Sequence, residues 1–588
     1  MKKFIAVFFL LILSPKIAYA TDDFLVSGEA TYEVDGSATK VTQEISITNA
    51  TTEVHATDFT LSLKGAEVSQ ARAFTEDGEL EVELTKGDVV KLKVLFDESI
   101  VGEGNSQNFT IEYLDASVVR VSGDVTEVSI PKLATETFDT YLIRLKVPNS
   151  FGAHSYMSPP PDNELGTGGF TTYYFDKAVV TLGVSAAFGK FQVFSFDLTY
   201  HLQNPLALPT EMEVALPPDT SFQKIFYQSV SPKPDNILVD PDGNWLAVYN
   251  LHARERLDVR AIGVVQVFAS PWRQFASNSP LEGSVYWQVE DPKVVEIANG
   301  LASPKEIYDY VVNTLNYNYE KVTTGSKRLG ALSALENPAE SICTEFTDLF
   351  IALARAKGIP AREVNGYAYT DNTSLRPLAL VADVLHAWPE YWDSERDLWV
   401  PVDPTWGKTT GGVDYFTKLD MRHINFVMHG VSPELPIPPG SYKLGANPQK
   451  DVFVALGELP QNTSSIPAIS ISQRGSLPFQ GLVLVAEIEN PGPAALYDQK
   501  VELFFDSAKK YESNLTTLLP YEKRILEFTV PYGFLGSSMP ETAELYVGNA
   551  REEFATNKNP ALARDVIAIS LTVVFCVAGV VIYIRRRK

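Results

Sequence analysis

The sequence predicts a multidomain protein of mostly β structure, with one α+β domain and one membrane-spanning helix. Three observations predict this fold class. Apolar and polar residues alternate in short segments over residues 21–285 and 450–556, which is typical of half-buried strands. Apolar residues recur at helical spacing between residues 290 and 360. Residues 566–584 carry no charge and are long enough to cross a bilayer.

Size and charge narrow the class further. At 588 residues the chain is long enough for several domains, since a domain has about 100–200 residues. Its hydrophobic content of 45% and charged content of 21% are ordinary for globular proteins. The net charge of −24 argues against nucleic acid as a partner, because binding phosphates requires basic patches.

Residues 1–20 have the pattern of a secretory signal peptide. Lys2 and Lys3 precede an apolar run, and Ala18-Tyr19-Ala20 fits a small-residue cleavage site. The alternative is an N-terminal membrane anchor, but the run is shorter than a bilayer core requires. The sequence therefore predicts export.

Two all-β domains are predicted to follow. Residues 21–131 contain short alternating segments separated by turns, which favours a β-sandwich. Residues 132–285 continue in the same way as a second all-β domain. Within it, residues 240–244 resemble part of a calcium loop but lack the bidentate glutamate, so we predict a hairpin turn.

An α+β domain is predicted for residues 290–430. Ser303 and Glu306 form a capping box with Pro304 at the first helical position. A second helix is expected from Ile342 to Lys357, with Ser341 as its N-cap. Strands are expected after this helix, at residues 361–370, 385–392 and 398–403.

The C-terminal part is predicted to be a linker, a sandwich and a membrane anchor. Residues 431–449 are rich in proline and read as a linker. Residues 450–556 resemble the Ig-like β-sandwich modules of many surface proteins. The membrane helix at 566–584 is followed by a basic cluster, 585–588, which should remain cytoplasmic. These features predict a single-pass type I protein of the cell membrane, with the bulk of the chain extracytoplasmic.

Cys343 is one of two cysteines, and the other, Cys576, lies in the predicted membrane helix. A disulfide between them is therefore not expected. An exported protein that keeps an unpaired thiol exposes it to oxidation, so this cysteine calls for an explanation. Its predicted place at a helix N-terminus favours the nucleophilic thiolate. The alternative is an inert buried cysteine.

His386 and Asp403 lie at equal distances from a predicted polar turn at residues 393–397. In the simplest hairpin register they are direct cross-strand neighbours, with Cβ atoms about 4.5–5.5 Å apart. The carboxylate would then orient the imidazole, and the other ring nitrogen would face a thiol. The alternatives are a core histidine with its hydrogen bonds satisfied and a strand-ending turn at Asp403.

The other acidic residues and histidines of this region are weaker candidates for the site. Asp393 and Asp397 lie in the turn, too far along the hairpin from His386. His423 and His429 have no acidic or thiol set at metal-binding spacing. The sequence therefore requires no metal or organic cofactor.

Three blocks of sequence resemble the transglutaminase-like superfamily. The first is the run from Cys343 to Tyr367, with the motif Ala354-Arg355-Ala356-Lys357-Gly358-Ile359-Pro360-Ala361-Arg362; the others are His386-Ala387-Trp388 and Asp403-Pro404-Thr405. In that family these blocks carry the nucleophile, the base and the orienting acid on a papain-like α+β core. Over residues 295–410 the resemblance implies a catalytic triad of Cys343, His386 and Asp403.

The sequence departs from the family pattern beside the nucleophile. Ser341 stands where the family usually has glycine, and Thr344 where it often has an aromatic residue or arginine. These departures concern the acyl pocket and the donor group. For the second oxyanion donor we consider Asn337, six residues before the cysteine, where papain-like enzymes place an amide.

Together these features predict a membrane-anchored, extracytoplasmic transglutaminase-like cysteine enzyme. It would act on amide or peptide bonds of a protein or peptide substrate at the cell surface, by acyl transfer or by hydrolysis. The alternative is a non-catalytic surface adhesion or binding protein that uses the same module as a scaffold. Most of the predicted exterior is β-sandwich, which is compatible with either.

Overall fold

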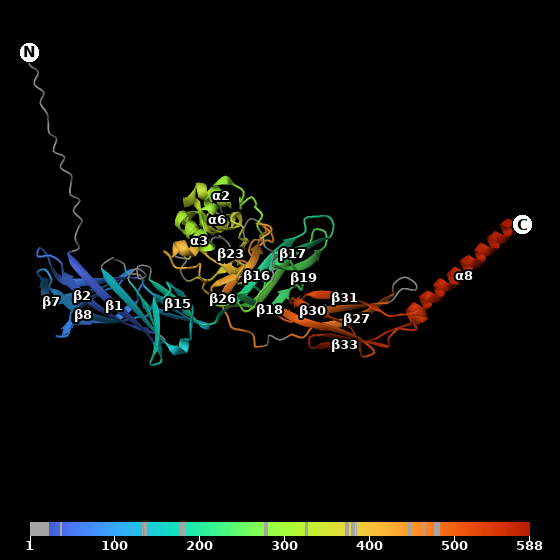
Figure 1. Cartoon of the computed structure of the whole chain (residues 1–588), viewed down its shortest axis with the longest axis horizontal. Coiled ribbons are helices and arrows are strands. Elements are labelled where there is room, and N and C mark those ends of the chain that lie inside the picture. The colour runs from blue at the N-terminus through green and yellow to red at the C-terminus, as the bar shows by residue number, and fades with distance from the viewer. Residues whose placement is uncertain are drawn as a thin grey trace, which may run out of the picture. The chain divides into compact units, whose positions relative to one another are not determined.

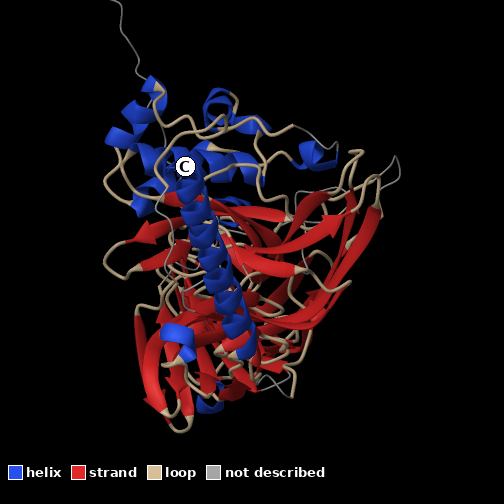
Figure 2. Cartoon of the chain, turned by 90° about the vertical axis from the view of Figure 1, so that its right-hand side faces the viewer, coloured by secondary structure: helices blue, strands red, loops and turns tan. Residues whose placement is uncertain are grey.

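The computed structural model folds as two compact units and consists mostly of strands (Figure 2). The first unit comprises the described residues up to 120 together with 127–152 and 157–186, and the second comprises the remainder. The predicted signal peptide lies outside the described residues. Those residues are 23–35, 38–131, 133, 138–176, 183–275, 280–323, 327–370, 376–377, 383, 385–444, 449–461, 465–475 and 482–587.

The first unit contains an eight-stranded sheet, β13-β14-β11-β1-β2-β8-β4-β5, and a three-stranded sheet, β3-β7-β6. Phe59 of β3 and Phe109 of β8 meet edge to face, with ring centroids 5.6 Å apart, where the two sheets share a core. The strands are β1 (Phe24–Asp35), β2 (Ala38–Asn49), β3 (His55–Lys64), β4 (Val68–Phe74), β5 (Glu79–Leu80), β6 (Val82–Thr85), β7 (Val89–Val101), β8 (Ser106–Asp115), β11 (Thr140–Pro148), β13 (Asn163–Thr167) and β14 (Phe170–Phe175).

The expected boundary at residue 131 does not coincide with a break in this sheet. β11 pairs in parallel with β1, from Ser27 with Thr140 to Glu33 with Lys146. Alternation identifies strands but not their partners, so a strand that returns to the first sheet looks like the start of a new domain. The chain changes from one unit to the other at residues 121–126, 153–156 and 187. The elements at or beside these positions are β9 (Val119–Ser122), β10 (Val125–Ile130), η1 (Asn149–Phe151), β12 (His154–Ser158) and β15 (Val184–Phe188).

The second unit begins with two sheets, β18-β21-β16-β26 and β17-β20-β19, that enclose one hydrophobic core. Residues 452–456, expected in the C-terminal sandwich, form β26 and pair with β16 here. The predicted turn at 240–244 joins β19 to β20. The strands are β16 (Phe191–Gln203), β17 (Thr210–Leu216), β18 (Gln223–Ser231), β19 (Asn236–Val239), β20 (Trp245–Leu251), β21 (Arg256–Phe268) and β26 (Val452–Leu456).

The α+β domain follows, with helices packed on the sheet β24-β23-β22-β25. Figure 1 shows α2, α3 and α6 grouped beside β23. The predicted cap of α3 is confirmed, because the Ser303 hydroxyl accepts from the Glu306 N–H. The elements are α2 (Pro292–Asn299), α3 (Pro304–Thr314), α4 (Tyr319–Thr323), α5 (Ala331–Glu336), η2 (Pro338–Glu340), α6 (Cys343–Ala356), β22 (Ala361–Ala368), β23 (His386–Asp393), β24 (Leu398–Pro401), α7 (Pro404–Thr409) and β25 (His423–His429).

Helix α6 starts at the predicted place but with a different cap. Its N-cap residue is Ile342, and the Ser341 hydroxyl is buried without a hydrogen-bond partner among the described residues. Instead, the carboxylate of Glu345 accepts from the backbone N–H of Ile342 at 3.0 Å and from that of Leu329 at 2.9 Å. Glu345 therefore plays the part of the acid in a capping box, which accepts from the N–H of the N-cap residue, while Ser341 does not cap the helix. The expectation for Ser341 was therefore wrong.

A buried ion network joins α6 to the sheet. Arg328 contacts both Asp348 of α6 and Glu363 of β22, the latter at 2.7 Å. The indole N–H of Trp287 donates to Asp348 at 2.9 Å. Both carboxylates are fully buried, and burial raises the pKa of Asp348, whereas Arg328 outweighs burial at Glu363 and lowers its pKa. The guanidinium therefore compensates two buried acids at once.

We expect Arg328→Leu to destabilise this domain by about 3–5 kcal/mol, because it leaves two buried carboxylates without their cation. Thermal unfolding of the detergent-solubilised full chain, followed by tryptophan fluorescence, measures this, since five of the seven tryptophans lie in residues 287–406. Lys305→Leu is the control, because it removes an exposed pair with Asp309 and should leave the midpoint unchanged. Equal midpoints for both variants would contradict the prediction.

The C-terminal part forms two sheets, β27-β28-β31 and β30-β29-β32-β33, around a common core. Helix α8 is long and apolar enough to cross a membrane, and residues 566–584 lie within it. The elements are β27 (Ala468–Gly475), β28 (Leu482–Glu489), β29 (Leu496–Phe505), β30 (Ala508–Leu518), β31 (Lys523–Val530), η3 (Phe534–Gly536), β32 (Thr542–Val547), β33 (Ala550–Ala555) and α8 (Asn559–Arg587).

Candidate active site

Cys343 is the first residue of α6, so its thiol lies at the positive end of a 14-residue helix. Its side chain is buried, with an exposed fraction of 1%. Ile342 and Ala387 form a small cluster with it, and Tyr317 and Val322 pack against them. These side chains therefore shield the sulfur from solvent.

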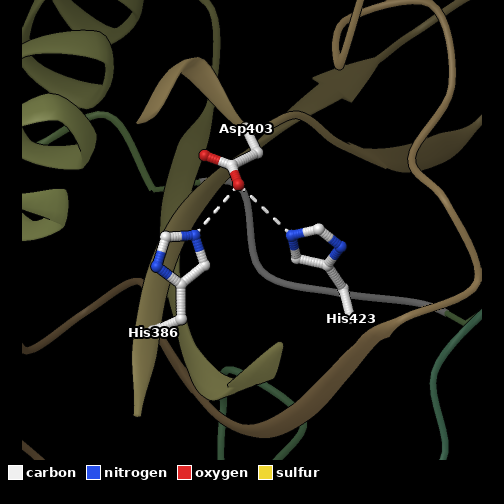
Figure 3. A group of neighbouring side chains, drawn as sticks. All are labelled: His386, Asp403 and His423. Carbon is white, nitrogen blue, oxygen red and sulfur yellow. Dashed lines mark hydrogen bonds and ion pairs between the residues drawn. The ribbon is translucent and has the colours of Figure 1, made fainter. Parts of the chain in front are cut away.

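His386 opens β23 and Asp403 is the N-cap of α7. His386 Nε2 and Asp403 Oδ2 are hydrogen-bonded at 2.9 Å, and both side chains are buried (Figure 3). The other carboxylate oxygen accepts from the backbone N–H groups of Thr405 and Trp406 at 2.9 and 3.0 Å. The carboxylate is thus held by a helix start as well as by the imidazole. The predicted hydrogen bond between His386 and Asp403 is present.

The hairpin register nevertheless differs from the expected one. Glu390 pairs with Pro401 and Trp392 with Trp399, so Asp403 would lie opposite Trp388 rather than His386. A shift of two residues keeps the same face of the strand, because side chains alternate with a period of two. Strand β24 also ends at Pro401, and the chain then turns into α7. Asp403 reaches His386 from a helix cap and not as a cross-strand neighbour.

His423 is a site residue that the sequence did not reveal. Its Nε2 lies 3.3 Å from the same Asp403 oxygen, and its Nδ1 lies 2.9 Å from Asp420 (Figure 3). It comes from β25, which pairs with β22. Sequence spacing could not place His423 beside a residue twenty positions earlier, because only strand pairing across the sheet brings them together. The Asp420 three residues before it was the one local signal.

The acid and the two imidazoles shift one another's pKa. Burial lowers the pKa of His386, but the Asp403 carboxylate outweighs burial and raises it to about 9. Burial also lowers the pKa of His423, and its bonds to Asp403 and Asp420 raise it to about 9. At Asp403, burial raises the pKa and His386 outweighs burial, so the carboxyl group stays well below its usual range. The site therefore holds an imidazolium beside a carboxylate at neutral pH.

The second ring nitrogen of His386, Nδ1, is the one that Asp403 does not bind. Its Nδ1 is buried and has no hydrogen-bond partner among the described residues, and the nearby Cys343 contributes to the raised pKa of the ring. Trp406 stacks on the imidazole at 5.3 Å and 23°, which restricts its rotation. One nitrogen is thus fixed by Asp403 and the other is available to the thiol.

The three side chains in Figure 3 also form the group best suited to a metal among the described residues, with ligand atoms within 4.8 Å of one another. Each of these atoms already takes part in a hydrogen bond between the histidines and Asp403. A metal would replace the bond that orients His386. The donor set therefore fits an oriented imidazole better than a metal centre.

Tyr317 presents a second unused polar atom beside the thiol. Its hydroxyl oxygen is buried and lacks a hydrogen-bond partner in the described part of the chain. A bridge between Tyr317 and Ser341 fixes it next to the start of α6. Burial, followed by the electrostatic influence of the neighbouring Cys343, raises the pKa of this hydroxyl, so it keeps its proton. Asn337, the other donor considered for the oxyanion, is exposed at the end of α5.

The fold and this geometry define a class: an α+β domain with a cysteine at a helix start, a histidine on the adjoining sheet and an aspartate that reaches this histidine from the start of α7. Residues 292–404 match the family model described as the transglutaminase-like superfamily. This part of the chain is a transglutaminase-like domain.

Three known proteins are similar to this chain over limited stretches. The chain is 36% identical over 69 residues to an uncharacterised protein of Mycobacterium tuberculosis, covering 11% of this chain and 22% of the relative. It is 25% identical over 181 residues to a protein-glutamine gamma-glutamyltransferase of Pseudomonas aeruginosa, covering 28% and 26%. The periplasmic domain of TgpA from Pseudomonas aeruginosa aligns with 16% identity and a TM-score of 0.22, covering 39% of this chain and 93% of that one. The chain thus spans about a quarter or less of the curated relatives' own length.

Proposed function

We propose that the protein is a membrane-anchored cysteine enzyme that cleaves amide bonds by way of an acyl-enzyme. The observation that carries the proposal is the His386 imidazole, which is tied to Asp403 through Nε2 at 2.9 Å and free at Nδ1, in a domain whose helix α6 begins at Cys343. An oriented imidazole beside a thiol is the arrangement that activates a sulfur nucleophile.

The proposed reaction has two stages, which are acylation of Cys343 and release of the acyl group. The Cys343 thiolate attacks the amide carbonyl and forms a carbon–sulfur bond. His386 gives its proton to the leaving nitrogen as the carbon–nitrogen bond breaks, which releases ammonia or an amine and leaves a thioester. Neutral His386 then takes a proton from an incoming amine or water, whose attack releases the acyl group. Transfer to an amine gives a new amide, and transfer to water gives hydrolysis.

Two donors suit the oxyanion that forms on the carbonyl oxygen. The backbone N–H of Cys343 is one of the first amides of α6, which have no partner within the helix. The Tyr317 hydroxyl is buried, protonated and unpartnered beside the same residue. Donors of this kind stabilise the charge that develops in the transition state.

We further propose that α8 anchors the enzyme with its folded part outside the cytoplasm. The basic cluster Arg585-Arg586-Arg587-Lys588 follows the apolar stretch, and such clusters favour the cytoplasmic side. The substrate would then be a protein or peptide at the cell surface. The relative from Pseudomonas aeruginosa carries the name of a glutamine transferase, which favours transfer to an amine over hydrolysis.

The test uses the detergent-solubilised full chain with a casein-type protein and a labelled primary amine. Amine incorporation, ammonia release and peptide cleavage are measured in parallel, which separates transfer, deamidation and proteolysis. We expect at least one product, reduced by about 10³-fold or more in Cys343→Ala, because the nucleophile is lost. Cys576→Ala is the matched control and should keep full activity. Equal product from both variants would point to the non-catalytic alternative.

A further inference from the structure

A pocket of about 240 Å³ lies beside the histidine–aspartate group, where the β18–β21 sheet adjoins the α+β domain. It opens to solvent among exposed residues such as Arg396 and Thr417. Its buried lining includes Trp388, His423 and Asn425. The volume is below the roughly 300–1,000 Å³ of pockets for drug-sized ligands, so it suits a small molecule.

Asn425 lines this pocket, and its side-chain amide has no hydrogen-bond partner among the described residues. Its exposed fraction is 5%, yet neither its amide nitrogen nor its amide oxygen has a hydrogen-bond partner among the described residues. Its backbone is held on both sides, because Gln223 donates to its carbonyl at 2.9 Å and accepts from its N–H at 2.9 Å. Gln223 therefore fixes the backbone of a residue that lines the pocket, and it does so without using the Asn425 side-chain amide.

A second unpaired acceptor lines the same pocket. Asp420 binds His423 through Oδ1, while its Oδ2 is buried without a partner in the described chain. Burial raises the pKa of Asp420, and its bond to His423 outweighs burial and lowers it, so the group is a carboxylate. A buried amide or carboxylate oxygen without a partner costs free energy, so such atoms in a pocket indicate a ligand that satisfies them.

The remaining lining mixes apolar and aromatic residues with polar and charged ones. Phe222, Phe268 and Leu419 accompany Trp388, and Glu390, Arg396 and Lys418 bring charged groups to the rest of the lining. Trp388 also lies against the catalytic group, with its ring 5.0 Å from His423 and 5.9 Å from His386. Cys343 is not among the residues that line this pocket. The site is therefore adjacent to the proposed triad without containing its nucleophile.

We propose that this pocket binds a small molecule with a primary carboxamide on an aromatic or apolar body. The ligand carbonyl accepts from the Asn425 amide nitrogen. One hydrogen of the ligand NH₂ group donates to the Asn425 oxygen and the other to Asp420 Oδ2, which uses all three unpaired atoms. The apolar body packs against Trp388, Phe222 and Phe268. At these three atoms a carboxylate ligand fits poorly, because it has no N–H to donate and faces the Asp420 charge; Arg396 and Lys418 line the pocket as well, which makes benzoate the informative comparison.

Isothermal titration of the full chain in detergent with benzamide tests the proposal, with benzoate as the comparison ligand. We expect benzamide to bind and benzoate to bind at least about tenfold more weakly. Asn425→Leu should weaken the binding of benzamide by about tenfold or more, because both hydrogen bonds to the Asn425 amide are lost. The same variant should melt at the same or a higher temperature without ligand, because it removes an unpaired buried amide.

Three outcomes would overturn the assignment. If benzamide binds the Asn425→Leu variant and the wild type with equal affinity, its binding site lies elsewhere. A lower melting temperature of Asn425→Leu without ligand shows that the fold itself uses the amide. Failure of benzamide to bind indicates a pocket filled only by water. Cys343→Ala should keep benzamide binding, so this site can be judged even if the proposed enzyme activity fails.

Discussion

Asp403→Asn is expected to reduce the rate of amine incorporation by about 10³–10⁴-fold while the domain remains folded. The asparagine can still accept from the backbone N–H groups of Thr405 and Trp406, so the start of α7 should survive. What is lost is the charge that raises the pKa of His386 and holds Nε2. The imidazole is then neither oriented nor kept protonated at neutral pH. Initial rates at saturating amine measure the effect.

The same variant should change the pH profile. In the wild type the pKa of His386 is raised to about 9, so the imidazolium is present below that pH and is lost as the pH rises through it. We therefore expect activity to fall near pH 9. Without the carboxylate, burial dominates and lowers the pKa of His386, so the fall should move down by about 1–3 pH units.

Asp393→Asn is the matched control for both measurements. Asp393 was a rival third member in the sequence, but it accepts from the backbone N–H groups of Glu395 and Arg396 within the turn. It should keep the wild-type rate and the wild-type alkaline limb. If Asp393→Asn lost as much activity as Asp403→Asn, the assignment of Asp403 would have to be abandoned.

Tyr317→Phe is expected to reduce the turnover number by about 10²–10³-fold with little change in KM. The hydroxyl is proposed to donate to the oxyanion, which exists only after the thiolate has attacked, so its loss affects the transition state more than substrate binding. Packing should be preserved, because phenylalanine keeps the ring that contacts Phe346 at 6.4 Å. Steady-state kinetics with the labelled amine separate the two constants.

Tyr319→Phe provides the control for this prediction. Tyr319 lies two residues further along, is 48% exposed, and meets the Tyr317 ring edge to face at 4.9 Å. Removing its hydroxyl should leave both constants near the wild-type values. A rise in KM for Tyr317→Phe with an unchanged turnover number would assign the hydroxyl to substrate binding and not to the oxyanion.

Local sequence patterns were sufficient for most individual elements. The cap of α3 at Ser303, the start of α6 near Cys343 and the strand that begins at His386 all lie where spacing and propensity indicated. These features depend on residues within a few positions of one another. Propensity and capping act over that range.

The contact between His386 and Asp403 shows where such reasoning succeeds in part. Side chains alternate between the two faces of a strand, so the hairpin pattern predicts that both side chains lie on one face. A register shift of two residues keeps them on that face. The way in which Asp403 reaches the imidazole could not be foreseen, because β24 ends early and the acid caps α7. The expected cap at Ser341 was likewise wrong, because Ile342 is the N-cap of α6 and Glu345 accepts from its backbone N–H.

By itself the sequence determined a cysteine at a helix start, a histidine and an acid on one face of a hairpin, and an apolar C-terminal segment. Only the tertiary structure decided that His423 shares Asp403, that the Tyr317 hydroxyl is unpartnered beside the thiol, and that Asn425 lies in a pocket next to them. The reason is physical. These residues meet through the pairing of β22 with β25, the bridge at Ser341 and the docking of Gln223 on β25, which are long-range contacts that no local pattern encodes.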